Sequence, residues 1–193
     1  MMTYSISCFV DFLISNGIVN PQQRSIYIYG FDLMFHTGIN TLCVLIIGIL
    51  SSHILEVLIL LFFFCCSQST GGGFHASTHL QCFIYVILGT LFYIFLISLS
   101  IPSRVVLWLG IIAVALLWRC PLVLHPNKSY LSSKHVTLIR RSKKFVTQCT
   151  ILLLLALHFN CSTAILSISY SLFLSALSRY IASLHKKNIC YHF

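Results

Sequence analysis

Charged side chains are scarce in this sequence of 193 residues. They make up 8% of the chain, whereas hydrophobic residues make up 58%, and the mean hydropathy is +0.94. A soluble globular domain carries about 25% charged residues. The shortage excludes an ordinary water-soluble domain and predicts a single compact domain that is surrounded mainly by lipid.

Acidic residues are the rarest group. Asp11, Asp32 and Glu56 stand against twelve Lys or Arg, which gives a net charge of +9. In so apolar a chain we attribute the excess to membrane topology, because basic residues collect on the cytoplasmic side. No basic face is interleaved with aromatic residues on a polar module, so we expect no nucleic-acid partner. Three carboxylates also provide few hydrogen-bond partners for metal ligands.

Several sequence signatures of catalysis are missing. The chain has no GxGxxG, P-loop, HExxH or GxSxG motif, which argues against nucleotide enzymes, zincins and serine hydrolases. Its nine cysteines are odd in number and contain no CxxC pair. We therefore expect no disulfide framework, and we expect most of the thiols to pack as small hydrophobic groups.

What the sequence does contain is a series of apolar runs, which predicts an all-α polytopic membrane protein with about six transmembrane helices. Residues 1–30 form an N-terminal interfacial segment, because their apolar stripe is shorter than the roughly 20 residues that a span needs. The transmembrane domain covers residues 31–182, with a basic loop at 120–144, and residues 183–193 form a tail. The expected spans are 31–50, 54–66, 80–99, 105–118, 145–159 and 163–182.

The last two apolar runs leave one alternative open. Asn160-Cys161-Ser162 interrupts them and predicts two spans, but the runs could also form one long tilted helix. The charge distribution favours six spans with both termini in the cytoplasm. One basic residue, Arg104, then lies outside and eleven lie inside: Arg24, Arg119, Lys128, Lys134, Arg140, Arg141, Lys143, Lys144, Arg179, Lys186 and Lys187.

The segment from Gly71 to Cys82 is the strongest candidate for chemistry. It contains three adjacent glycines, His75, His79 and Cys82 between two apolar runs, and the six-span topology places it at the cytoplasmic face. Because that compartment is reducing, we expect Cys82 to be a free thiol.

Three interpretations of this segment compete on residue types alone. Cys82 can be a nucleophile with a histidine as its base, the set His75, His79 and Cys82 can ligate a metal, or these residues can be interfacial without a chemical role. On a continuous helix, residues seven apart lie about 10 Å apart along the axis. His75 therefore reaches Cys82 only if the chain bends, which the glycines allow. His79 is the easier partner on a regular helix, so spacing does not choose between the two histidines.

Gly72-Gly73-Phe74-His75-Ala76, followed by Cys82, resembles the signature of the accessory gene regulator B (AgrB) family. Pro121 followed by His125-Pro126-Asn127-Lys128 and a basic stretch matches a second part of the pattern, and the length and six apolar runs match as well. The resemblance covers nearly the whole chain.

This resemblance implies a membrane cysteine endopeptidase with His75 as base and Cys82 as nucleophile. Its substrate is expected to be an AgrD-type propeptide, which is cut near its C-terminal part and closed into a cyclic quorum-sensing peptide. No metal or cofactor is implied, the location is the cell membrane of a bacterium, of the Gram-positive type, and a homodimer is compatible with the resemblance. We also name Gly72, Gly73, Gln68 and Lys128 as candidates for substrate binding or oxyanion support.

The sequence departs from the family pattern at one place. Members often carry Arg just before the glycines, whereas Cys66-Ser67-Gln68-Ser69-Thr70 contains no basic residue. If that Arg contacts the propeptide, Gln68 implies different recognition. Two other functions remain as rivals: a non-catalytic exporter or channel for small peptides, and a metal-dependent membrane enzyme that uses His75, His79 and Cys82.

Overall fold

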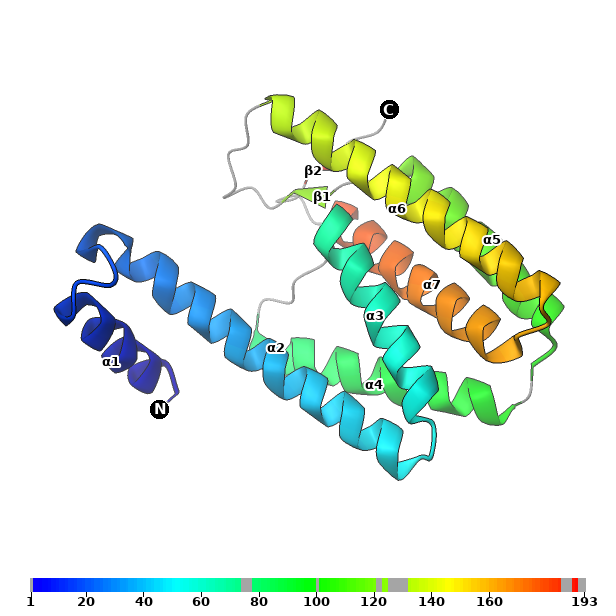
Figure 1. Ribbon diagram of the computed structural model, residues 1–193, viewed down its shortest axis with the longest axis horizontal. Coiled ribbons are helices and arrows are strands. Elements are labelled where there is room, and N and C mark those ends of the chain that lie inside the picture. Colours follow the sequence, from blue (N-terminus) through cyan, green and yellow to red (C-terminus); the bar gives the residue numbers. More distant parts are fainter. Residues whose placement is uncertain are drawn as a thin grey trace. The chain divides into compact units, whose positions relative to one another are not determined.

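The computed structural model describes residues 2–73, 78–99, 101–120, 123–124, 132–184 and 189–190. Helices make up nearly all of this part, so the all-α prediction is confirmed (Figure 1). A 3-10 turn at Pro21–Gln23 precedes α2, and β1 (Val123–Leu124) pairs antiparallel with β2 (Ile189–Cys190). The helices are α1 (Met2–Ser15), α2 (Arg24–Leu50), α3 (Ile54–Gly71), α4 (His79–Ser98), α5 (Ser103–Arg119), α6 (Ser132–His158) and α7 (Ser162–Leu184).

Most helix limits lie at polar breaks in the sequence, but α3, expected at 54–66, continues to Gly71. Asn20 caps the turn that leads into α2, since its side chain accepts from the N–H of Gln22 at 3.0 Å. Ser52 and Asn160 adopt the left-handed backbone conformation, with φ of 61° and 52°, and so terminate the helices before them. Because α6 ends at His158 and α7 begins at Ser162, the alternative of one long tilted helix is wrong.

Within the described ranges, four helices are long and apolar enough to cross a membrane, namely Pro21–Leu50, Ile54–Gly71, His79–Ser98 and Ser162–Leu184. The other two expected spans correspond to α5, which is shorter, and to α6, whose first half carries the basic residues. The count of six spans, the topology and the domain limits at residues 30 and 182 stay predictions. Residues 132–144, expected within a loop, are helical.

The chain forms two units, Met1–Ile46 and Ile47–Phe193. In the first unit, α1 folds against the beginning of α2. Arg24 donates two hydrogen bonds to the carboxylate of Asp11, at 2.6 and 2.8 Å, and the rings of Phe9 and Phe31 meet edge to face at 5.2 Å. Val10 is fully buried in this helical hairpin.

In the second unit, α7 is the central helix. Figure 1 shows it between α3 and the pair formed by α5 and α6. The core consists of small and branched apolar residues from three helices, and they bury one face of α5, one face of α6 and much of α7. These residues are Val106, Ala113, Leu117, Val146, Cys149, Leu153, Ala156, Ile165, Ile168, Leu172 and Ala176.

Two tyrosines attach α4 to α7. The hydroxyl of Tyr93 lies 2.6 Å from that of Ser167, and the hydroxyl of Tyr170 donates to the carbonyl of Gly89 at 2.8 Å. The two tyrosine rings stack with their centroids 5.2 Å apart. Tyr93 and Thr90 are the buried residues of α4, so most of its surface is left for lipid.

The cysteines follow the expectation with one exception. The free cysteines include Cys82, whose side chain is partly buried. Cys149 is buried in the core and packs as a small hydrophobic group. Cys120, at the C-terminal end of α5, is disulfide-bonded, which the cysteine pattern did not predict.

Candidate active site

The glycine run ends α3 and begins the connection to α4. Gly71 is the last helical residue, and the N–H of Gly72 donates to the carbonyl of Gln68 at 2.9 Å. Gly72 has a φ of +67°, a conformation that favours glycine. The left-handed backbone conformation of Gly72 therefore sets the direction in which the chain leaves α3.

Arg179 of α7 lies directly against Gly71. Its side chain is 1% exposed, and a Cβ on Gly71 would overlap its guanidinium group. The guanidinium donates to the carbonyl and the hydroxyl of Ser67, at 2.9 and 3.1 Å, and to the hydroxyl of Ser142 in α6 at 3.0 Å. A cation at the C-terminal end of α3 also complements the helix dipole. Arg179 thus ties three helices together at the end of α3.

The neighbouring residue on α7, Ser178, contacts the other end of the glycine run. The side-chain amide of Gln68 donates to the Ser178 hydroxyl at 3.1 Å. A Cβ on Gly73 would overlap the amide oxygen of Gln68 and would lie 2.6 Å from the Ser178 hydroxyl. Ser178 and Arg179 therefore form a contact that we call the α7 clamp, and it explains why Gly71 and Gly73 have no side chain.

The α7 clamp corrects the expectation that all three glycines provide flexibility. Of the three, Gly72 has the left-handed backbone, whereas Gly71 and Gly73 allow close packing against α7. Gln68, expected to contact substrate, is hydrogen-bonded to α7 in this structure.

Cys82 lies in the first turn of α4. Thr78 caps this helix with an extended backbone, and its hydroxyl accepts from the N–H of Gln81 at 3.3 Å. Thr-x-x-Gln is the pattern of a capping box, a signal of a helix start that was present in the sequence. The N–H of Cys82 donates to the carbonyl of Thr78 at 3.2 Å. A thiol in this position is close to the positive end of the helix dipole, which is a common place for reactive cysteines.

The structure places some of the predicted site residues and not others. His75, with the rest of 74–77, and Lys128 lie outside the described residues, so the His75–Cys82 pairing stays a prediction. His79 is the first residue of α4 and is exposed.

Sequence reasoning missed the α7 clamp, although the sequence carried a signal for it. Ser167, Ser171, Ser175 and Arg179 recur at intervals of four in an otherwise apolar helix, and all four are buried. Residues at this spacing share one face of a helix. In a membrane helix, polar residues on one face turn toward neighbouring helices, and an ionisable residue among them marks a site of structural or functional interest.

Comparisons with known proteins agree with the motif in the connection between α3 and α4. The family model described as accessory gene regulator B matches residues 6–181, nearly the whole chain. No curated protein and no solved structure gives a match. With its apolar helices and this match, the chain is a membrane protein that belongs to the accessory gene regulator B family.

Proposed function

We propose that this protein is a membrane cysteine endopeptidase that cleaves an AgrD-type propeptide at Cys82 and closes the released fragment into a ring. Family membership supports a role in the accessory gene regulator system, which is a quorum-sensing system. The observation that carries the catalytic assignment is the position of Cys82, a free thiol in the capped first turn of α4. We propose His75, four residues before the first residue of α4, as its base.

The reaction consists of two acyl transfers. The Cys82 thiolate attacks the carbonyl of the scissile peptide bond, and the protonated imidazole of His75 gives its proton to the leaving amine. This step forms a thioester and releases the C-terminal part of the propeptide. A Cys or Ser side chain of the bound fragment then attacks the thioester carbonyl, and its proton passes to His75. The ring closes as a thiolactone or lactone, and the Cys82 thiolate is regenerated.

Exclusion of water is essential for this chemistry, because hydrolysis of the thioester would prevent ring closure. A site at the edge of the bilayer limits the access of water. The tetrahedral intermediates need a hydrogen-bond donor for their oxyanion. The N–H groups of Gly72 and Cys82 donate within the helix ends, so the N–H of Gly73 is the donor that we propose.

The α7 clamp has a direct role in this proposal. It fixes Gly71 and Gly73, and the capping of α4 by Thr78 fixes the other end of the connection that contains His75. Both ends of a four-residue connection are thereby anchored, which limits the positions that His75 can take relative to Cys82. Lys128 is the proposed contact for the acidic tail of the propeptide.

The proposal is tested by incubating the purified protein in nanodiscs with an AgrD-type propeptide and measuring cleavage by mass spectrometry. Cys82→Ala and His75→Ala are expected to abolish cleavage, because each removes one member of the dyad. His79→Ala and Cys66→Ala are matched controls that keep cleavage, because neither residue takes part in the acyl transfer.

Cleavage that persists in Cys82→Ala would rule out this enzyme. Loss of cleavage in His79→Ala, together with bound zinc in the purified protein, would favour the metal-dependent rival. Peptide transport without cleavage, unchanged by Cys82→Ala, would favour an exporter.

A further inference from the structure

Helix α5 and the apolar part of α6 are short for membrane spans. The apolar part of α6 covers residues 145–158, about 21 Å of helix, and α5 with 17 residues is about 25 Å long. The hydrocarbon core of a bilayer is about 30 Å thick. A span that is too short brings its flanking residues to the level of the headgroups, where Lys and Arg extend toward the polar region.

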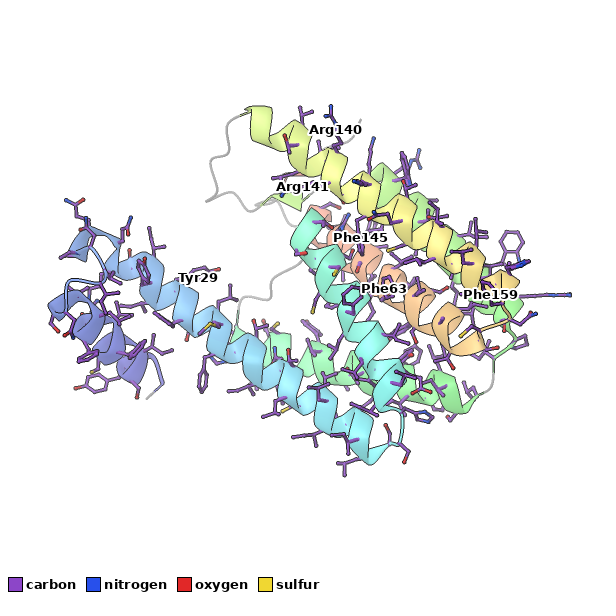
Figure 2. The ribbon with its side chains drawn as sticks, viewed as in Figure 1. Tyr29, Phe63, Arg140, Arg141, Phe145 and Phe159 are labelled. Carbon is purple, nitrogen blue, oxygen red and sulfur yellow. The ribbon has the colours of Figure 1, made fainter. Side chains whose placement is uncertain are left out.

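The residues next to the apolar part of α6 are cations that face away from the bundle. Arg140, Arg141 and Lys144 are exposed, and they occupy the turn just before Phe145. Ile139, Ser142 and Val146 on the opposite side of the same turn are 8%, 0% and 0% exposed. Figure 2 shows Arg140 and Arg141 in the first half of α6. We call Arg140, Arg141 and Lys144 the basic turn.

An aromatic residue of α5 lies at the same level as the basic turn. The ammonium group of Lys143 lies 5.4 Å from the ring centre of Trp118, which is 44% exposed near the end of α5. Tryptophan is enriched at the boundary between hydrocarbon and headgroups. The side chain of Trp118 therefore marks the basic turn as part of a membrane–water interface.

Within residues 47–193, the acidic side chain lies far from this surface. Glu56 is the only Asp or Glu in residues 47–193, and it lies in the first turn of α3. Arg179 donates hydrogen bonds both to Ser142, in the basic part of α6, and to Ser67, near the C-terminal end of α3. The basic part of α6 therefore lies near the end of α3 that is opposite Glu56. Ser67 lies eleven positions after Glu56, which corresponds to about 16 Å of helix. Glu56 therefore does not supply the counter-charge of the basic turn, and an anion from another molecule fits this surface.

We propose that the basic turn of α6 binds the headgroups of anionic phospholipids and so anchors α5 and α6 in the cytoplasmic leaflet. The adjoining surface of α6 is apolar, since Ile151, Leu152, Leu154 and Leu155 are exposed, and it fits acyl chains rather than a soluble acidic peptide. A phospholipid offers both parts at once, a phosphate for the cations and a chain for the apolar residues. Each Lys or Arg near an anionic membrane surface strengthens the binding to that membrane about fivefold.

The test measures quenching of Trp118 fluorescence by brominated lipids. The chain has two tryptophans, so Trp108→Phe leaves Trp118 as the single tryptophan, which is excited selectively at the red edge of the absorption band. This variant is placed in nanodiscs that contain either brominated phosphatidylglycerol or brominated phosphatidylcholine. The proposal predicts at least about fivefold stronger association of the phosphatidylglycerol with the site near Trp118. High salt is expected to reduce this preference, because the ion pairs lie near the surface.

The triple variant Arg140→Gln, Arg141→Gln, Lys144→Gln is expected to lose the preference. It leaves Lys143 beside Trp118, and circular dichroism checks that its helices form. Two control variants act at the other end of α5. Trp118→Phe leaves Trp108 as the reporter of lipid near that end. Arg104→Gln, made together with Trp108→Phe, removes a cation from that end while Trp118 still reports on the basic turn. Quenching of Trp108 is expected to be equal for the two lipids. Arg104→Gln is expected to leave the preference measured at Trp118 unchanged.

Three results would overturn the proposal. They are equal quenching of Trp118 by the two lipids, a preference that persists in the triple variant, and a response of Trp118 to polyglutamate in place of phosphatidylglycerol. The last result would assign the basic turn to an acidic peptide. None of these measurements depends on peptide cleavage, so they test the lipid site separately from the proposed catalytic function.

Discussion

The contact between Gly71 and Arg179 predicts that the effect of Gly71→Ala on stability depends strongly on whether Arg179 is present. In most helices, replacing an internal Gly by Ala stabilises the fold by about 0.5–1 kcal/mol. In this helix the added Cβ would overlap the guanidinium of Arg179, which must then move. Its movement would break hydrogen bonds to Ser67 or Ser142, each worth about 1.5–3 kcal/mol because the donor is charged. Gly71→Ala is therefore expected to cost about 1–2 kcal/mol.

The same substitution should be favourable when Arg179 is absent. In an Arg179→Ala background the Cβ has space, and Gly71→Ala should stabilise the helix by its usual amount. The effect of Gly71→Ala thus differs between the two backgrounds by about 1.5–3 kcal/mol, which is the coupling energy of a double-mutant cycle. Reversible unfolding in sodium dodecyl sulfate, measured by circular dichroism, gives the four free energies of unfolding.

A glycine that packs against Val57, Gly48 of α2, provides the control for this coupling. Gly48→Ala, in a helix end that does not contact Arg179, serves as the control and should show the same cost in both backgrounds. If Gly71→Ala has the same effect with and without Arg179, within about 0.5 kcal/mol, the close packing described for the α7 clamp is wrong.

Two further predictions follow from polar contacts elsewhere. Tyr93→Phe removes the hydroxyl that bonds to Ser167 and should lower the free energy of unfolding by about 1 kcal/mol, as detergent unfolding would show; no change would mean that the contact does not hold α4. In α1, which is too short to span a membrane, hydrogen bonding to Arg24 lowers the pKa of Asp11 below 3.8. Any stability from this pair is therefore present above the ordinary pKa of a carboxyl and is lost as the pH falls through the lowered pKa; NMR titration of Asp11 at an ordinary value would contradict it.

The sequence predicted the helices well because their limits depend on local chemistry. Ser52 and Asn160 stop helices through their own backbone conformations, and the Asn20-Pro21 pair starts one. Such signals are contained in a few adjacent residues. The prediction of a polar loop over residues 120–144 was less accurate. The basic residues from 134 to 144 belong to the first half of α6, which continues without a break into the apolar second half.

The candidate site was predicted only in part, because its support comes from distant parts of the chain. The position of Cys82 near the start of a helix followed from the sequence. The contact of Ser178 and Arg179 with the glycine run joins residues more than one hundred positions apart. The polar face of α7 was visible in the sequence, but it did not show which segment that face contacts. The absence of a basic residue at 66–70 suggested altered recognition. In the structure, a guanidinium does lie against this segment, but it comes from α7.

The most direct test of the central claim is to trap the thioester on Cys82. An AgrD-type propeptide whose internal Cys or Ser is replaced by Ala can be cleaved but cannot close its ring. After incubation with the protein in nanodiscs, intact mass spectrometry should show the N-terminal fragment attached to Cys82, and hydroxylamine should release it. No adduct on the wild-type protein while the unmodified propeptide is still cleaved, or an adduct that persists in Cys82→Ala, would contradict the account.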